Sequence, residues 1–574
     1  MPGAVVECVP NISEGRRRDV IDAVVQAADS VQGMRVLDVD PGAATNRTVI
    51  TMAGEPDAVL EAAFRLIDRA AGLIDMRTHS GEHPRHGATD VCPFVPVSGV
   101  TMEDCVELAR RLGSRVGNEL GIPVYLYEFA ASIPERSKLP DIREGEYEAL
   151  PGKLGKPEWK PDFGPDEWSE RTARTGVCTI GARNFLIAYN VNINSRDAGV
   201  AREIALTIRD TGRNARSPDW TFLRDGNGKK VKQPGLLQCC KATGWYIDEY
   251  RTAQVTMNLT DISVTPLHIG YETTRKVAEG LGVTVTGSEV VGLVPLCAML
   301  DAGRYYLERQ NEGLRAIGRQ ARTTGVPEKE LVEIAVRSMG LSDVAPFRPE
   351  EKIIEYMLRE GGASLAGMSC ADFVDELSMD SPAPGGGSVA ALVGSLAAAL
   401  ASMVANLTAR SRKCRESWDD MMELAPRAQT IKDFMLSAVD GDTRAFNRMM
   451  EASRSGEGVQ EAILGAALVP MSVLEHCLEI AGMAAKLERE GLPASLSDSG
   501  VAALAAASAA ESAYYNVLIN LDQLEDQEQA ETLRQKAGAL LEEIGSTAGR
   551  TAALVRERLL LHAEDAGDDS GDAD

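Results

Sequence analysis

The sequence lacks several signatures that would restrict its class directly. Its 10 cysteines are spread over 574 residues with no CxxC pair and no dense framework, which excludes a disulfide scaffold and fits reduced thiols. Lys and Arg total 60 against 85 Asp and Glu, a net charge of −25, and no basic run is long enough to hold a phosphate backbone. The chain does not open on a charged segment followed by an apolar stretch, so no signal peptide is expected. These absences favour a cytoplasmic protein with neither nucleic acid nor membrane as partner.

Length and composition are those of a multidomain globular protein. At about 150 residues per domain, the chain is long enough for about four folding units. Its 44% hydrophobic and 25% charged residues are ordinary for folded chains. One stretch, residues 381–409, carries no charge. Its length would permit a membrane span, but its high content of Ala, Gly and Ser favours a buried, close-packed helix.

Strand and helix patterns alternate in the first half. Residues 5–97 follow the order β-α-β-β-α-β, which is the split-βαβ arrangement of ferredoxin-like folds. The same order recurs over residues 185–291. The sequence therefore predicts two tandem ferredoxin-like α/β (βαββαβ) subdomains, with the seam near a Gly-containing turn at Thr179–Ala182. A helical extension is expected from about Leu307 to Leu358.

The composition changes at about Met368. Strand patterns vanish and alanine dominates, and short connections such as Gly491–Pro493 are typical of an up-and-down helical bundle. The residues from Glu564 onward are strongly acidic, which predicts a disordered tail. The predicted helices begin at Val389, Glu416, Gln460, Ser499 and Glu528. The predicted domains are 1–183 and 184–358 (α/β subdomains), 359–367 (linker), 368–562 (all-α helical domain) and 563–574 (tail).

Half of the six histidines lie within eight positions, in the segment His79–Gly87. Histidines beside Arg and Glu suit proton transfer or metal binding. Pro84 breaks the helical spacing of an HExxH zinc site, so proton transfer, a metal site and a Gly/Pro turn with solvated histidines all stay open. Asp38 and Asp40 end a nearby strand on the same side, where they could reach one cleft or form a turn.

Two segments of the helical half contain residues that are unusual at the start or in the interior of a helix. Asp380–Ser388 places three glycines before the Ala-rich helix, where free N–H groups attract anions and glycine lets a ligand approach closely. It has no GK[ST] of a nucleotide loop, and a flexible turn capped by Ser388 is the alternative. Asp440–Asp442 puts Gly and two Asp inside a helical pattern, which indicates either function or a surface pair of acids.

Longer motifs, in one consistent order, resemble two families of folate enzymes. Those that resemble glutamate formimidoyltransferases are Val6–Gly15, Leu37–Asp40, Thr45–Thr48, Gly81–Arg85, Asp90–Pro96, Pro161–Pro165, Gly181–Arg183, Gly244–Tyr246 and Gly292–Pro295. Two later motifs, Ala383–Ala390 and Tyr515–Leu521, resemble formimidoyltetrahydrofolate cyclodeaminases. Together they resemble the bifunctional formimidoyltransferase-cyclodeaminase family over nearly the whole chain.

The resemblance implies a multifunctional enzyme of histidine breakdown and one-carbon metabolism, a transferase joined to a lyase. The first half would move the formimino group from N-formimino-L-glutamate to N5 of tetrahydrofolate. The second half would then close the ring to 5,10-methenyltetrahydrofolate and release ammonia. The alternative is that one half is catalytic while the other binds folate or acts as a scaffold. The resemblance further implies a homo-oligomer, polyglutamylated tetrahydrofolate as co-substrate, and no metal.

Site residues follow from the same resemblance. His83 would take a proton from the attacking amine and return one to the departing glutamate, and Asp40 would orient His83 or hold its charge. Asp442 matches the proton donor of the second half, where burial would help it to keep a proton. His86 departs from the family, which more often has an apolar residue there. The residues implied in folate or substrate binding are Gly164, Pro165, Gly176, Arg183, Gly235, Leu236, Leu237, Gly385, Gly386, Gly387 and Ser388.

Overall fold

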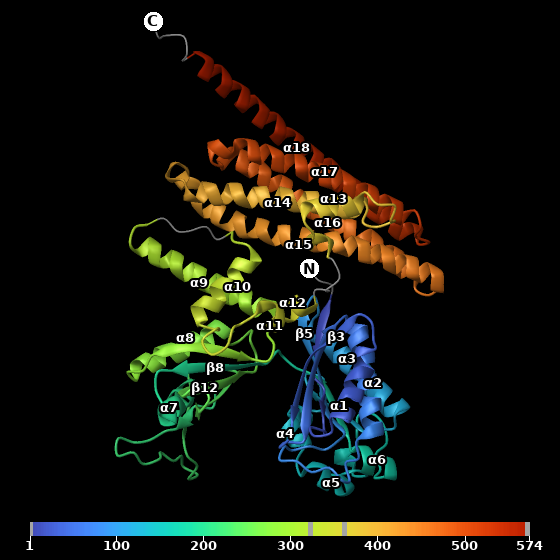
Figure 1. Cartoon of the computed structure of the whole chain (residues 1–574), viewed down its shortest axis with the longest axis vertical. Coiled ribbons are helices and arrows are strands. Elements are labelled where there is room, and N and C mark those ends of the chain that lie inside the picture. Colours follow the sequence, from blue (N-terminus) through green and yellow to red (C-terminus); the bar gives the residue numbers. More distant parts are fainter. Residues whose placement is uncertain (1–3, 320–324, 359–363, 569–574) are drawn as a thin grey trace. The chain divides into compact units, whose positions relative to one another are not determined.

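The computed structural model describes residues 4–319, 325–358 and 364–568. Its contacts divide the chain into two compact units (Figure 1). Of the described residues, 4–302 and 335–358 form an α/β unit, and the others form a helical unit. The division falls within helices α9 (Leu296–Ala316) and α10 (Glu328–Met339). The prediction of a sheet-containing first half and a helical second half is thereby confirmed.

The first sheet of the α/β unit has the strand order β3-β4-β1/β2-β5-β7-β6. Its strands are β1 (Val5–Cys8), β2 (Asn11–Ile12), β3 (Met34–Gly42), β4 (Arg47–Gly54), β5 (Thr89–Ser98), β6 (Val124–Glu128) and β7 (Cys178–Ala182). Strands β1 to β5 pair antiparallel, whereas β7 pairs parallel with both β5 and β6. Three helices pack on this sheet (Figure 1): α1 (Arg18–Asp29), α2 (Pro56–Leu73) and α3 (Met102–Glu119). In α1, Val20, Ile21, Val24 and Ala28 recur at helical spacing and are buried, which explains both the helix and its orientation.

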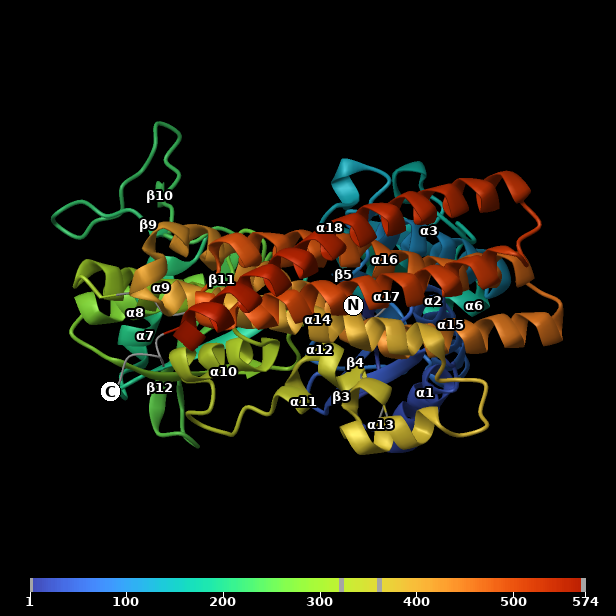
Figure 2. The same cartoon turned by 90° about the horizontal axis from the view of Figure 1, so that it is seen from above.

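The second sheet is antiparallel throughout, in the order β11-β12-β8-β13. Its strands are β8 (Ile187–Ile193), β11 (Cys240–Ile247), β12 (Thr252–Leu259) and β13 (Val285–Val291), with helices α7 (Ala198–Ile208) and α8 (Leu267–Gly280) packed on it. This connectivity repeats that of β1, β3, β4 and β5 in the first sheet. Strands β9 (Arg213–Asn214) and β10 (Lys232–Gln233) pair at the base of a projecting arm (Figure 2).

Shorter helices complete the α/β unit. They are α4 (Leu139–Ile142), α5 (Glu146–Lys153), α6 (Glu170–Thr175), α11 (Pro349–Lys352) and α12 (Ile354–Leu358), with 3-10 turns η1 (Pro134–Arg136) and η2 (Pro157–Trp159).

One local prediction for this unit was wrong. The predicted turn at Thr179–Ala182 belongs to the fully buried strand β7. A Cβ on Gly181 would lie 2.4 Å from the Tyr127 ring, so this glycine permits close approach of β6 rather than a turn. Strand β5 runs without interruption through Pro93 and Pro96.

The helical unit consists mainly of long helices joined by short connections (Figure 2). They are α13 (Cys370–Leu377), α14 (Gly386–Arg410), α15 (Trp418–Ser455), α16 (Val459–Glu490), α17 (Leu496–Leu521) and α18 (Gln527–Asp568), with 3-10 turns η3 (Leu365–Gly367), η4 (Arg412–Ser417) and η5 (Pro493–Ser495). Buried alanines on α14 and α17, among them Ala398 and Ala506, allow these helices to approach closely. Asp440–Asp442 lies inside α15, which continues through these weak helix formers.

Serines spaced seven residues apart fix how α14 packs on α15. Ser388, Ser395 and Ser402 donate to the carbonyls of Val439 (2.9 Å), Lys432 (3.3 Å) and Ala425 (3.1 Å), which are also seven apart. The residue numbers of the serines increase while those of their acceptors decrease, so the two helices run antiparallel with a defined register. That register sets the start of α14 beside Asp442.

Two helices, α14 and α16, are long and apolar enough to span a membrane, with 61% and 50% of their most apolar windows buried. Core helices of soluble proteins meet the same criterion. At the chain's end, α18 continues to Asp568, past the start of the predicted tail, and residues 569–574 lie outside the described residues. Of the predicted linker, residues 359–363 also lie outside them, whereas Leu365 packs in the core of the helical unit.

Candidate active sites

The His79–Gly87 loop is held against the segment that leads into β4. The Asn46 amide donates to the Ser80 carbonyl (3.0 Å), and the Asn46 carbonyl accepts from His79 Nε2 (2.9 Å). A Cβ on Gly81 would lie 2.1 Å from the Thr45 carbonyl oxygen, so only glycine permits this approach. The loop that carries His83 is therefore positioned by backbone contacts rather than free in solvent.

His83 is partly buried, and its Nδ1 lies 2.7 Å from the Pro84 carbonyl oxygen. Because a carbonyl only accepts hydrogen bonds, Nδ1 carries the proton and Nε2 keeps its lone pair. Burial, reinforced by the positive charge of Arg47, lowers the pKa of His83. The ring is thus held neutral with one nitrogen ready to accept a proton.

A buried carboxylate, Asp90, lies under the loop. It accepts from Arg47 Nη1 (2.5 Å), Arg143 Nη2 (2.6 Å) and the backbone N–H of His86 (2.9 Å). Burial alone would raise the pKa of Asp90, but His86, Arg47 and Arg143 together bring it below its usual value. Asp90 therefore stays ionised and anchors both arginines beside the His83 loop.

The other two histidines of the loop have structural partners. Arg85 Nε donates to His79 Nδ1 (3.3 Å), and the same guanidinium is paired with Glu148 (2.7 and 2.8 Å). His86 is 1% exposed, and its Nε2 lies 2.7 Å from the Thr179 hydroxyl. Burial lowers the pKa of His86 to about 4. His86 is thus a buried, neutral histidine whose ring nitrogen has the Thr179 hydroxyl as a partner.

Asp40 lies on β3, paired in register with Val49, and its side chain is exposed. Within the described residues, no hydrogen bond or ion pair joins Asp40 to His83. The acid whose charge acts on His83 is Asp90. The orienting role of Asp40 therefore stays a prediction.

The predicted folate glycines of the α/β unit lie in tight backbone packing. Gly164 (φ 82°) and Gly176 (φ 65°) are left-handed, and added Cβ atoms would lie 2.5 Å from the Ile122 carbonyl and 2.2 Å from that of His86. Gly176 also bridges to Gly87, which brings it to the His83 loop. Pro165 follows Gly164 and is partly exposed.

Gly235–Leu237 packs on the end of α7. A Cβ on Gly235 would lie 1.9 Å from the Arg209 carbonyl oxygen, and Leu236 and Leu237 donate backbone bonds to the last turn of the helix. The Leu236 side chain is 64% exposed, whereas Leu237 is buried. An exposed leucine of this kind is available for contact with a ligand.

Arg183 lies at the end of β7 among carboxylates. Burial raises the pKa of Glu7 to about 7, while Arg183 opposes the shift and Glu355 adds to it. Burial likewise raises the pKa of Glu128, again against Arg183. The charge of the predicted substrate residue Arg183 therefore acts on two carboxyl groups, and its side chain donates to the Asn184 carbonyl (3.0 Å).

The helical unit brings Asp442 to the glycines that start α14. Ser388 Oγ lies 3.3 Å from Asp442 Oδ2 and also donates to Val439. Burial raises the pKa of Asp442, although the hydrogen bonds from Ser388 lower it in part. Across the site, Gly386 faces Asn516 of α17, whose Nδ2 would lie 3.2 Å from an added Cβ. Two motifs more than fifty residues apart, and a third on α17, thus meet at one place.

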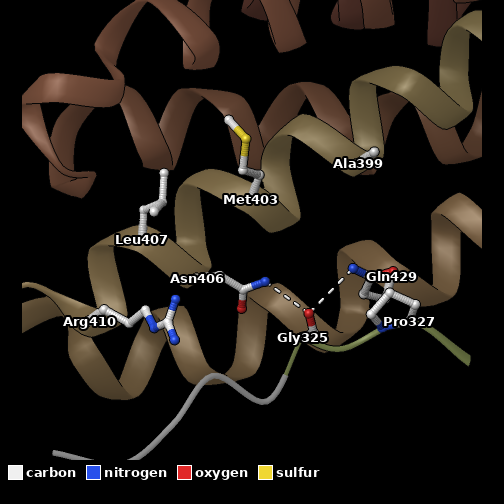
Figure 3. Close-up of a pocket in the computed structure, with 8 residues that line it drawn as sticks. All are labelled: Gly325, Pro327, Ala399, Met403, Asn406, Leu407, Arg410 and Gln429. Atoms are coloured by element: carbon white, nitrogen blue, oxygen red, sulfur yellow. Dashed lines mark hydrogen bonds between the residues drawn. The ribbon is translucent and has the colours of Figure 1, made fainter. Parts of the chain in front are cut away.

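A pocket of about 320 Å³ lies elsewhere in the helical unit, against α14 and α15 (Figure 3). Asn406 and Gln429 both donate to the Gly325 carbonyl there (2.8 and 3.4 Å). None of the predicted site residues lines it. Among the residues that the structure describes, no group of three or more His, Cys, Asp or Glu could hold a metal ion.

Comparison with known proteins gives matches along almost the entire chain. Residues 5–183 match the model of the formiminotransferase domain, N-terminal subdomain, residues 188–359 that of the formiminotransferase domain, and residues 369–539 that of formiminotransferase-cyclodeaminase. The formimidoyltransferase-cyclodeaminase of Rattus norvegicus is 42% identical over 552 residues, 94% of this chain and 96% of that protein. The chain belongs to the formimidoyltransferase-cyclodeaminase family.

Relatives of each half of the formimidoyltransferase-cyclodeaminase also exist separately. Glutamate formimidoyltransferase of Thermoplasma acidophilum is 43% identical over 307 residues, 53% of this chain and 93% of that protein. The crystal structure of formiminotetrahydrofolate cyclodeaminase from Thermotoga maritima is 31% identical, covers 33% of this chain and 94% of that one, and has a TM-score of 0.31. Both the formimidoyltransferase and the cyclodeaminase domains are present here, which confirms the family predicted from the motifs.

Sequence reasoning on this formimidoyltransferase-cyclodeaminase chain missed the Arg47–Asp90–Arg143 network. Arg47 and Asp90 both lie within motifs that carry the family resemblance, so the signal was available. Arg143 lies in no such motif and comes to Asp90 through α4, whose C-terminal cap it forms. Only the fold brings it to this site.

Proposed function

We propose that this chain transfers the formimino group of N-formimino-L-glutamate to N5 of tetrahydrofolate and then cyclises the product to 5,10-methenyltetrahydrofolate with release of ammonia. The observation that carries the proposal is that each half holds a proton-handling residue in the state its step requires. His83 presents a free Nε2, and Asp442 sits half-buried against the glycine start of α14.

In the transferase half, N5 attacks the amidine carbon and must lose a proton, and the departing glutamate amine must gain one. A neutral His83 whose Nδ1–H is held by the Pro84 carbonyl can accept the first proton at Nε2 and donate it in the second step. Asp40 is proposed to orient His83 or to stabilise the charge on its ring. Gly164, Pro165, Gly176, Arg183 and Gly235–Leu237 are proposed to contact folate or substrate.

In the cyclodeaminase half, N10 attacks the formimino carbon and ammonia departs. Ammonia leaves readily only as a protonated amine, so a general acid is needed. Burial raises the pKa of Asp442, which favours the protonated carboxyl that can supply this proton. Gly385–Gly387 and Ser388 are proposed to line the folate site, because glycines let a ligand approach the start of a helix closely.

The finer predictions of fold and context belong to the same proposal. The two α/β subdomains, 1–183 and 184–358, are ferredoxin-like, which the strand order β11-β12-β8-β13 and its repetition in the first sheet support. The interval between the family matches that end at residue 359 and begin at residue 369 supports a linker at 359–367 and a helical domain that begins at 368. The end of this domain at 562 and the tail 563–574 are part of the proposal. The enzyme is proposed to be a cytoplasmic homo-oligomer that uses polyglutamylated tetrahydrofolate without a metal.

The test supplies purified protein with formiminoglutamate and tetrahydrofolate, and follows methenyltetrahydrofolate by absorbance and ammonia in parallel. His83→Gln should abolish transfer yet still cyclise 5-formiminotetrahydrofolate supplied directly. Asp442→Asn should transfer but accumulate that intermediate. Asp440→Asn is the matched control, because Asp440 lies two positions before Asp442. Asp440 accepts a hydrogen bond from the Leu365 backbone N–H, and the amide oxygen of Asn can still accept it. Absence of both products with the unaltered enzyme would refute the proposal.

A further inference from the structure

Two nearly buried arginines in the α/β unit have few hydrogen-bond acceptors. The Arg47 and Arg143 side chains are 10% and 11% exposed. Within the described residues, Arg47 donates to Asn11 (3.1 Å) and Asp90, and Arg143 donates to Asp90. Arg143 Nε is buried without an acceptor. A guanidinium has five N–H donors, so most of those on this pair are unused.

Two equally buried arginines nearby have more acceptors. Arg85, 9% exposed, donates to Glu146, to Glu148 and to both the ring and carbonyl of His79. Arg136, also 9% exposed, donates to Asp162 and to two backbone carbonyls, and lies 5.0 Å from the centroid of the Tyr125 ring. Among these four arginines, Arg143 with one acceptor and Arg47 with two have the fewest.

The two arginines also have only one carboxylate in hydrogen-bond contact among the described residues. Two guanidinium groups share the single carboxylate of Asp90, and both approach the same oxygen, Oδ2. His86, the other titratable group in contact with Asp90, is buried and neutral at pH 7. Glu146 also acts on Arg143 by its charge, but it is paired with Arg85. A further anion in hydrogen-bond contact would therefore stabilise the two guanidinium groups in this poorly solvated site.

The arginine pair belongs to the site of His83. Arg47 directly follows Asn46, which bonds His79 and Ser80 of the His83 loop. Asp90, between the arginines, accepts the backbone N–H of His86 at the other end of that loop. An anion at the pair would therefore lie beside the proposed proton acceptor.

We propose that Arg47 and Arg143 form a subsite for a substrate carboxylate, and that it takes the glutamyl moiety of the formimino donor. This assignment rests on the proposed transferase function. Planar, bidentate guanidinium groups suit carboxylates. Folate also carries glutamyl carboxylates, but these lie at the opposite end of folate from N5. The carboxylates of formiminoglutamate lie a few bonds from the carbon that reacts at His83.

The experiment measures L-glutamate binding to the full chain by calorimetry, and KM for formiminoglutamate and for tetrahydrofolate. Arg143→Gln should weaken glutamate binding and raise KM for formiminoglutamate about tenfold to a hundredfold, the loss of one charge-assisted hydrogen-bonded pair. KM for tetrahydrofolate should not change. Arg115→Gln is the matched control, because Arg115 is paired with Glu61 of α2 and Glu119 of α3.

Each outcome decides between the assignments. A rise in KM for tetrahydrofolate instead would assign the subsite to folate and overturn the donor assignment, and unchanged binding of both would overturn the subsite. If glutamate binding depends on Arg143 but no formimino group is transferred, the proposed function is refuted and the carboxylate subsite is supported. If Arg143→Gln does not fold, Arg143→Lys takes its place. It keeps the positive charge but loses the planar, bidentate guanidinium group, so it must still weaken glutamate binding.

Discussion

A Cβ added to Gly387 would lie 2.0 Å from Oδ1 of Asp442. The backbone at the start of α14 and the proposed proton donor on α15 are therefore in direct contact. The seven-residue serine series that pairs these helices produces this contact. One heptad further along, Gly394 meets Met435 in the equivalent position.

Gly387→Ala should therefore disable cyclodeaminase activity selectively. The methyl group must displace the Asp442 carboxylate, and we expect a loss of at least about a hundredfold, since an ångström of misplacement has that effect in active sites. Transferase activity should be unchanged. Gly394→Ala, whose Cβ would lie 3.0 Å from the flexible Met435 side chain, is the control. Equal losses in both variants would show that helix packing, not Asp442, is being disturbed.

Ser388→Ala should shift the pH dependence of cyclodeaminase activity. The hydrogen bonds from Ser388 lower the Asp442 pKa, so removing the hydroxyl raises it. Because the protonated carboxyl is the proposed donor, activity is lost as pH rises through that pKa, and this basic limb should move to higher pH. Ser395→Ala loses an analogous buried bond to Lys432, should destabilise the unit by about 1 kcal/mol, and should leave the pH profile in place.

The acid limb of the transferase pH profile should lie below the ordinary histidine value of 6.5, because burial and then Arg47 lower the pKa of His83. Protonation of His83 removes the proton acceptor, so activity falls as pH falls through its pKa. Arg143 also lowers that pKa, so Arg143→Gln should move the limb to higher pH while Arg143→Lys should not. Initial rates at saturating substrates between pH 5 and 8 test this, and equal profiles would contradict it.

Patterns along the chain were sufficient for the layers of the fold but not for the packing of particular residues. Apolar spacing predicted α1 and α2 because each buries one face on a sheet. Gly181 was misassigned because a glycine that lets Tyr127 approach looks the same in sequence as one that turns the chain. His83 and Asp442 came from motifs, whereas the contact of Arg143 with Asp90 joins residues 53 apart. The serine heptad of α14 was visible in the sequence and could have predicted the register with α15.

Acidification should destabilise the α/β unit through His86. Burial lowers the pKa of His86 from 6.5 to about 4, so between these values the unfolded chain binds a proton that the folded state does not. The free energy of unfolding therefore falls as pH drops through this window, by about 3 kcal/mol in all, and its contribution is complete above pH 6.5.

The variant His86→Leu removes this titration and installs the apolar type that the family resemblance favours at this position. Denaturant unfolding measures the free energy of unfolding of both proteins at pH 7 and pH 5. The carboxylates titrate in both proteins, so their effect cancels in the comparison. The unaltered chain should lose more stability than His86→Leu over this interval. Equal losses of stability in the two proteins would mean that His86 is already protonated in the folded state. Its contact with Asp90 would then be an ion pair rather than a contact of a neutral ring.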